Sequence, residues 1–220
     1  MKSKTPFPCF LAALAVVAAP LHAALVITPT GATSTTTIGS GDRVIDHTID
    51  GSGLVDVSDP SSVLDDFHPY VGTSAYWLSA STAVADGTEE LTFDLGGIYD
   101  VDTVYYWLYT RDADRPLRTF DISYSTDGGG SFSSPVSAAS LNMADWSIGP
   151  GNRSDAYVES RTFDTLSGVT NIRFSNLQNH GDPSYFALAE IRFGNSTIPE
   201  PSASLLVSLI IFPLLLRRRG

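Results

Sequence analysis

The stretch that decides the fold is LTFDLGGIYDVDTVYYWLYTRDADRPLRTFDISYSTDGGGSF, residues 91–132. Apolar and polar residues alternate in Leu91–Leu95, which is the period of a strand with one buried face. The run Val101–Tyr109 carries β-branched and aromatic residues on both faces, as a central sheet strand does. Alternation resumes in Phe120–Tyr124 and stops at the turn sequence Asp127–Gly130. The stretch therefore predicts consecutive strands.

The same pattern continues outward from this stretch. Ile172–Phe174 and Ala187–Phe193 read as further strands, and residues 24–196 contain no sustained helical period, internal repeat or linker. The Ser/Thr-rich stretch Thr30–Thr37 fits either a flexible lead-in or a first edge strand. Short strands separated by turns favour a β-sandwich over βαβ units. We expect one all-β domain over residues 24–196.

The composition limits the class of protein. The chain has 220 residues and a formal net charge of −11, which argues against a coiled coil and a basic nucleic-acid binder. Its one cysteine, Cys9, excludes a disulfide-stapled miniprotein. Residues 24–198 hold eight arginines, no lysine and 23 acidic residues, a formal charge of −15. Because such a domain repels anionic polymers, a neutral glycan or a calcium-bridged contact is favoured.

The first 23 residues have the pattern of a secretory signal peptide. Lys2 and Lys4 form a positive start, Phe10–Pro20 is apolar, and Ala23 offers a small residue at a cleavage point. The apolar run is short for a membrane span. We expect cleavage near Ala23, so that the exported domain carries no cysteine.

The last segment, residues 197–220, has three parts in order. Pro199, Glu200 and Pro201 come first, the apolar run Ala203–Leu216 follows, and the chain ends with the basic residues Arg217, Arg218 and Arg219. As a helix the apolar run is about 21 Å long, short of the roughly 30 Å of a bilayer core. Terminal arginines fit the cytoplasmic side of an anchor. A minimal tail anchor is one interpretation.

The second interpretation comes from a resemblance. The three parts together resemble the PEP-CTERM sorting signal of Gram-negative bacteria, which a membrane protease called exosortase recognises. The resemblance implies transient anchoring in the inner membrane, cleavage near Pro199–Pro201, and delivery to the cell surface or extracellular matrix. It also implies an association with extracellular polysaccharide or biofilm. A weak, removable tail follows the same physical logic as a GPI signal.

The middle of the chain carries a second resemblance. Asp94-Leu95-Gly96, the strand after it, Arg118 and Ser125–Gly128 occur in the order found in discoidin-like (coagulation factor C-type) and galactose-binding-like domains. Ala187–Ile191 resembles the closing strand of that superfamily, and Ile49-Asp50-Gly51 with Tyr76-Trp77 resembles its first loop. The likeness covers most of residues 42–194 and departs from the pattern at 137–161. It implies a jelly-roll β-sandwich.

The resemblance also implies a structural calcium ion. Bacterial members often hold calcium with the first Asp-Gly loop and a glutamate of the last strand, which here gives Asp50, the carbonyls around Gly53, and Glu190. Calcium prefers oxygen ligands of this kind. The alternative is that Asp50 only shapes a turn and that Glu190 faces solvent.

Sugar-binding relatives place an aromatic surface and a few polar side chains in loops at one end of the sandwich. An aromatic ring packs on the C–H face of a sugar while polar groups bond its hydroxyls. Trp146 is the best candidate for an exposed aromatic residue. Trp77 is also a candidate, but it sits in an apolar stretch that favours a core position. The remaining candidates are His47, His68, Arg111, Arg115, Asn179 and His180.

The sequence offers little for catalysis. His47 lies near Asp46 and Asp50, but no nucleophile elbow, zinc-protease helix or phosphate loop occurs. We therefore expect an exported, non-catalytic surface or matrix protein that associates with polysaccharide. The alternatives are a purely structural matrix protein without a specific ligand and a small secreted hydrolase that uses His47.

Overall fold

The computed structural model describes residues 25–36, 42–54, 67–69, 75–107, 109, 112, 114–134 and 155–195. All of them belong to one compact unit, Ala24–Thr197. The predicted signal peptide and the predicted sorting segment lie outside the described residues. No helix in the described part of the chain is long and apolar enough to cross a membrane.

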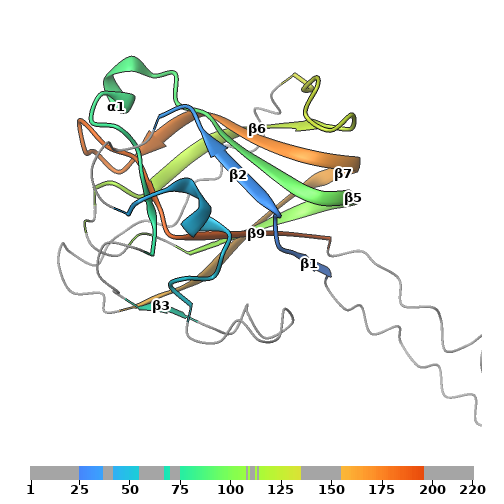
Figure 1. Cartoon of the computed structure of the whole chain (residues 1–220), viewed down its shortest axis with the longest axis horizontal. Coiled ribbons are helices and arrows are strands. Elements are labelled where there is room, and N and C mark those ends of the chain that lie inside the picture. Colours follow the sequence, from blue (N-terminus) through green and yellow to red (C-terminus); the bar gives the residue numbers. More distant parts are fainter. Residues whose placement is uncertain are drawn as a thin grey trace, which may run out of the picture. The chain divides into compact units, whose positions relative to one another are not determined.

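The described residues are almost entirely strand. The only helical segments among them are two four-residue turns, the 3-10 helix η1 (Ile45–Thr48) and the helix α1 (Ala83–Asp86). The strands are β1 (Leu25–Ile27), β2 (Gly31–Ser34), β3 (Phe67–Pro69), β4 (Trp77–Leu78), β5 (Leu91–Trp107), β6 (Leu117–Ser125), β7 (Asp155–Asn179), β8 (Ala187–Leu188) and β9 (Glu190–Asn195). The predicted all-β class is confirmed (Figure 1).

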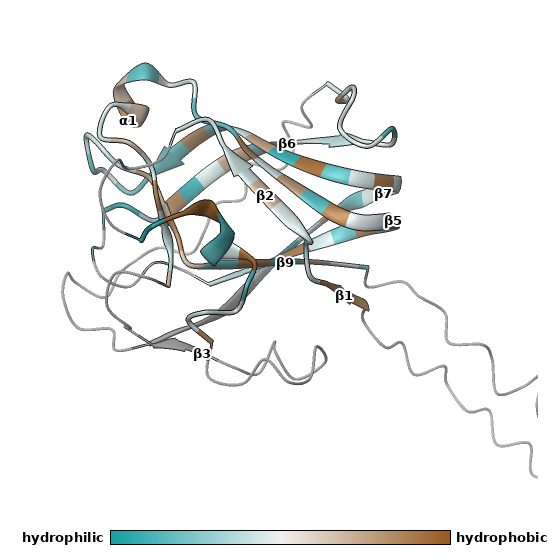
Figure 2. Ribbon diagram, in the orientation of Figure 1, coloured by the Kyte–Doolittle hydropathy of each residue, from teal (hydrophilic) through white to brown (hydrophobic). Residues whose placement is uncertain are grey.

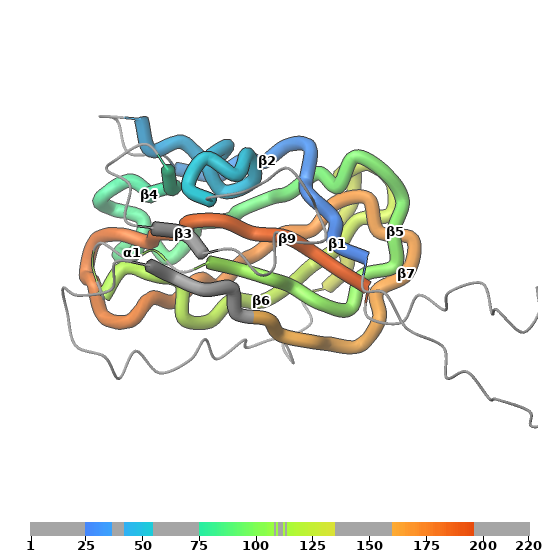
Figure 3. The backbone as a smooth tube through the Cα atoms, turned by 90° about the horizontal axis from the view of Figure 1, so that it is seen from below, coloured from blue at the N-terminus to red at the C-terminus, as the bar shows by residue number. Residues whose placement is uncertain are grey.

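Two long strands contribute to both layers of the fold. The first part of β5, Leu91–Asp94, pairs with β2 and with the end of β7, whereas Thr103–Trp107 pairs with β9 and the start of β7. β6 extends the first layer along β7, and β1 and β3 extend the second. β4 and β8 form a separate two-stranded sheet. Figures 1 and 3 show β5 and β7 curving together from one layer to the other.

The bend lies at Gly96 and Gly97, directly after the alternating run Leu91–Leu95. The β5–β7 register is irregular between Asp94 and Thr103, yet β5 continues through it. Gly96 has a φ of 71°, and a Cβ atom there would lie 2.4 Å from Cγ2 of Thr30. Only glycine fits such a position. The glycine pair therefore folds one strand over rather than ending it.

The core lies between the two layers. The Phe93 ring of β5 is 5.2 Å from the Phe174 ring of β7 in its own layer and 5.7 Å from the Phe193 ring of β9 in the other layer, measured between centroids. These contacts across the layers confirm the predicted sandwich. Figure 2 shows the expected alternation of apolar and polar residues along β5, β6 and β7.

A second apolar cluster covers the outer face of the β9 layer. Along the end of β5, Val104 and Tyr106 pack in the main core, whereas Tyr105 and Trp107 belong to the second cluster. This strand is therefore buried on both faces, as its composition predicts. The other buried members of the second cluster are Tyr76, Leu78, Tyr109, Ala187 and Ala189.

Candidate functional site

Four loops distant in sequence meet at one end of the sandwich. The N–H of Leu78 donates to the carbonyl of Arg43, and the N–H of Ser79 donates to the carbonyl of Phe186 at 3.0 Å. The N–H of Ala187 donates to the carbonyl of Arg115 at 2.9 Å. These bonds join loops 42–54, 75–80, 112–116 and 179–186 into one surface, which we call the loop end.

The most developed feature of the loop end is an arginine stacked on a tyrosine. The Cζ atom of Arg115 lies 4.8 Å from the centroid of the half-buried Tyr185 ring. Nε of Arg115 donates to Oδ2 of Asp182 at 2.9 Å, and Nη2 lies 3.2 Å from Oδ2 of Asp112. The planar guanidinium is therefore held in one orientation by two carboxylates and an aromatic face.

The charges in this feature are fixed by their neighbours. Burial alone would lower the pKa of Arg115, but its hydrogen bond to Asp182 and the charge of Asp112 outweigh burial and raise that pKa. Burial alone would raise the pKa of Asp182, yet the same hydrogen bond and two backbone N–H groups lower it. The loop end thus presents a permanent cation beside a permanent carboxylate.

The loop that carries Tyr185 is organised by its own hydrogen bonds. Oδ1 of Asp182 accepts the N–H of Ser184 at 2.8 Å and that of Tyr185 at 2.9 Å. Nδ2 of Asn179 donates to the carbonyls of Asp182 and Tyr185, both at 2.7 Å. The N–H of His180 donates to the carbonyl of Asp114. Because the loop is held before any ligand arrives, binding costs less conformational entropy.

A second cluster on the loop end surrounds His47. Nδ1 of His47 lies 3.0 Å from Oδ2 of Asp50, and Nε2 lies 3.4 Å from Oδ1 of Asp42. The N–H of Ser52 donates to Oδ1 of Asp50 at 2.8 Å. Burial would raise the pKa of Asp50, but hydrogen bonds from Ser52 and His47 outweigh it and lower that pKa. Asp50 therefore shapes the turn and stays ionised.

This arrangement disfavours His47 as a base for Ser52. Oγ of Ser52 lies 3.3 Å from Nδ1 of His47, the same nitrogen that meets the Asp50 carboxylate at the shorter distance of 3.0 Å. That nitrogen must carry a proton to bond Asp50, so it has no lone pair to accept a proton from Ser52. A triad instead uses opposite ring nitrogens for its base and orienting roles.

Glu190 lies beneath the first loop and is fully buried. Its Oε2 accepts the N–H of Gly51 at 3.2 Å, and its Oε1 accepts a hydrogen bond from Nη1 of Arg192, whose side chain is only 4% exposed. Burial raises the pKa of Glu190 to about 8, against the opposing effects of Arg192 and the Gly51 N–H. The expectation that Glu190 faces solvent is wrong.

These contacts bear on the calcium prediction. Asp50 and buried Gly53 lie in the first loop, and Glu190 of β9 accepts the N–H of Gly51 from the same loop. However, both oxygens of Glu190 already accept hydrogen bonds, and Arg192 supplies the positive charge. A calcium ion bound here by Glu190 would have to displace the guanidinium of Arg192. Among the described residues, no three His, Cys, Asp or Glu side chains gather as a metal site. Calcium binding stays a prediction.

The other predicted ligand contacts have mixed outcomes. Trp77 is 0% exposed and packs in the main core, so its ring offers no surface to a sugar and its core alternative holds. His47 and His180 are half-buried on the loop end, where Arg115 and Asn179 join them. Arg111, Trp146 and the side chain of His68 lie outside the described residues, as do Pro199–Pro201 and Arg217–Arg219.

Sequence reasoning missed three residues of this region. Tyr185 and Asp182 lie in Gly181–Tyr185, where an Asp followed by Pro and Ser is typical of a turn that its side chain caps. Arg192 is two residues after Glu190 on one strand, and residues at this spacing share a face. That spacing was the available signal for the buried ion pair.

Comparison with known proteins gives similarity in structure only. No family model and no curated protein matches the chain. A family 32 carbohydrate-binding module from C. perfringens NanJ, solved with galactose, is 15% identical over 78% of this chain and 99% of that one, with a TM-score of 0.47. Module CBM32-3 from a family 31 glycoside hydrolase of Clostridium perfringens is 18% identical over 78% and 94%, with a TM-score of 0.49. A pectin-binding module is 13% identical over 79% and 96%, with a TM-score of 0.46. At identities this low, these similarities describe the fold alone.

Proposed function

We propose that this protein is a non-catalytic carbohydrate-binding protein and that it binds a neutral polysaccharide at the loop end. The observation that carries the proposal is the partly exposed Tyr185 ring with the Arg115 guanidinium stacked on it and fixed by Asp182. The sequence resemblance to galactose-binding-like domains supports the same end of the sandwich.

The chemistry of this feature suits a sugar. The part of the Tyr185 ring that Arg115 and the second apolar cluster leave exposed can pack against the apolar C–H face of a pyranose, and guanidinium and carboxylate groups bond neighbouring hydroxyls. The domain has a formal charge of −15 between residues 24 and 198, and Arg115 already lies between Asp112 and Asp182. Because this cation is locally neutralised, a neutral glycan fits better than an anionic one.

The termini give the proposal its cellular setting. On the strength of its two end segments, we propose that the chain is exported and briefly anchored in the inner membrane of a Gram-negative bacterium. Exosortase-type cleavage near Pro199–Pro201 would then release it to the cell surface or extracellular matrix. Intact-mass analysis of the exported protein tests this: a mass without residues 1–23 and without Arg217–Arg219 supports it, and a retained tail contradicts it.

Affinity gel electrophoresis against galactan, glucan, mannan and xylan tests the binding site. We expect one of them to retard the protein, and Tyr185→Ala or Arg115→Ala to weaken the dissociation constant at least tenfold, about 1.4 kcal/mol. Arg118→Ala is the matched control, because Arg118 is exposed on β6 outside the loop end. Absence of retardation favours the purely structural alternative, and wild-type binding by Tyr185→Ala refutes the site.

A further inference from the structure

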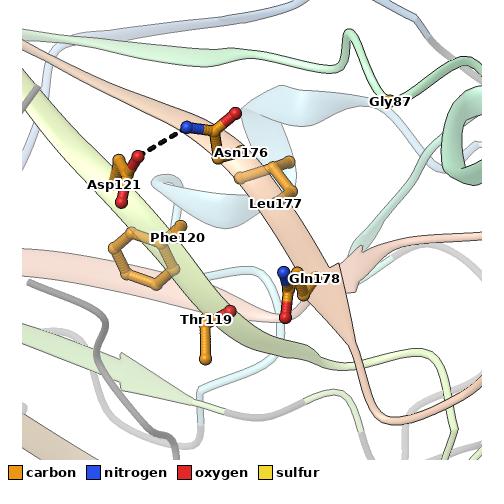
Figure 4. Close-up of a pocket in the computed structure, with 7 residues that line it drawn as sticks. All are labelled: Gly87, Thr119, Phe120, Asp121, Asn176, Leu177 and Gln178. Carbon is orange, nitrogen blue, oxygen red and sulfur yellow. Dashed lines mark hydrogen bonds between the residues drawn. The ribbon is translucent and has the colours of Figure 1, made fainter. Parts of the chain in front are cut away.

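A groove of about 550 Å³ runs along β6 and β7, outside the loop-end site (Figure 4). Its volume is within the range of roughly 300–1,000 Å³ typical of small-ligand sites. Figure 4 shows the polar side chains in two groups along the two strands. The lining residues are Gly87, Thr119, Phe120, Asp121, Asn176, Leu177 and Gln178.

A β-bulge places the polar side chains of β7 in this groove. The β6–β7 register shifts between the pairs Thr119–Gln178 and Asp121–Ser175, so β7 has one residue more than β6 there. Asn176 sits in that bulge with a φ of 51°, the only positive value at a non-glycine residue in the part of the chain that the structure describes. Bulges re-aim side chains and are frequent beside functional sites.

The groove is lined mainly by polar side chains, because its apolar residues Phe120 and Leu177 belong to the core beneath it. The Phe120 ring is buried and stacks on Phe174 with centroids 4.0 Å apart. Nδ2 of Asn176 donates to Oδ2 of Asp121 at 2.5 Å, and Gln178 is exposed. A carboxylate and two amides offer both donors and acceptors, which is the chemistry that binds a run of sugar hydroxyls.

The groove adjoins the loop-end site along the strands. The Thr119–Gln178 pair is next to Leu117–Asn179, the pair that ends the β6–β7 ladder. Asn179 in turn holds the carbonyl of Tyr185. From Asn179 to Asn176 the strand advances by about 10 Å at roughly 3.3 Å per residue. A ligand engaging both surfaces must therefore be longer than a single sugar.

We propose that this groove continues the loop-end site, so that the protein binds the inside of an extended neutral polysaccharide chain rather than a terminal sugar alone. The inference rests on the proposed function. It predicts that the affinity for an oligosaccharide increases with the length of the sugar chain. Substitutions in the groove, but not at the loop end, should abolish this increase.

Isothermal titration with galacto- and gluco-oligosaccharides of two and six units tests this on the purified protein. We expect the wild type to bind a hexasaccharide at least tenfold more tightly than the matching disaccharide. The variant Asn176→Gly/Gln178→Ala should bring that ratio close to one with unchanged disaccharide affinity. Glycine retains the left-handed backbone at 176, so the bulge is kept. Thr162→Ala, an exposed change on β7 outside the groove, is the control.

The outcomes separate the two proposals. A wild-type ratio near one, or a ratio unchanged in Asn176→Gly/Gln178→Ala, overturns the groove and leaves the loop-end site standing. Loss of the ratio in that variant, together with wild-type binding by Tyr185→Ala, would place binding in the groove alone and overturn both the loop-end site and its continuation into the groove. Absence of binding to every oligosaccharide overturns both. An unchanged urea midpoint shows that each variant is folded.

Discussion

Replacing Arg192 with methionine gives the sharpest test of how the last strand is held to the first loop. Methionine keeps most of the side-chain volume and removes the charge. Arg192 is 4% exposed and donates to the fully buried Glu190, which also accepts the N–H of Gly51. After Arg192→Met the Glu190 side chain stays buried without its counter-charge, so its pKa rises further above about 8 and its ionised form has no compensating cation.

The expected loss of stability follows from this burial. Breaking a buried ion pair by removing one partner costs about 3–5 kcal/mol, because the remaining charge is left uncompensated. The Arg173–Glu90 pair is the comparison, since its side chains are 33% and 44% exposed at a separation of 3.5 Å. Exposed pairs of this kind contribute about 0–1 kcal/mol. Arg192→Met should therefore destabilise far more than Glu90→Gln.

Urea unfolding at about pH 10 is the assay, because Glu190, whose pKa is raised to about 8, is ionised in the wild type at that pH. With a slope of about 2 kcal/mol per molar urea, the midpoint should fall by about 1.5–2.5 M in Arg192→Met. The deficit should shrink at pH 5, because Glu190 can then be protonated and no longer needs a cation. The double variant Glu190→Gln/Arg192→Met should recover most of the loss. A single-variant loss below about 1 kcal/mol, or a deficit equal at both pH values, would refute the reasoning.

Three further outcomes follow from the described contacts. Gly194→Ala should destabilise by about 1–3 kcal/mol in urea unfolding, because a Cβ there would lie 2.6 Å from the Tyr105 ring, whereas Gly31→Ala should be nearly neutral. Burial raises the pKa of Glu89 in the folded state, so stability should fall as pH rises above about 4.5, and Glu89→Gln should flatten that dependence. If Arg192 alone balances the charge of Glu190, the melting temperature should not change when a chelator is added. Stabilisation of about 2.7 kcal/mol by calcium, at a hundredfold excess over its dissociation constant, would instead show that the ion is bound.

The strands could be predicted because buried and exposed side chains alternate along each strand of a sandwich, and this alternation can be read within a few consecutive residues. Leu91, Phe93 and Leu95 are buried and Asp94 is exposed, as the alternation predicts. Thr30–Thr37 left two interpretations open, and the structure places the edge strand β2 within it. The Ser/Thr-rich composition could not decide between a flexible lead-in and an edge strand, because an edge strand depends on the neighbouring strand with which it pairs.

The site was less predictable because its contacts join distant loops. Arg115 and Asn179 were candidates, but the stacking of Arg115 on Tyr185 joins positions 70 residues apart. Trp77 was easier to place, because its apolar neighbours favour a core position. The structure buries it there, in the strand β4 that pairs with β8.

The positions of the arginines connect the charge of the domain to its proposed ligand. In the part of the domain that the structure describes, Arg115, Arg173 and Arg192 pair with carboxylates of the same domain. These cations stabilise the fold and the loop end rather than forming a basic surface. The domain keeps its acidic excess, which repels an anionic polymer. Arg115 does little to offset this repulsion, because its charge is already shared by Asp112 and Asp182. An aromatic ring, amides and carboxylates can bind sugar hydroxyls without any charge on the ligand. For this reason we propose a neutral polysaccharide as the ligand.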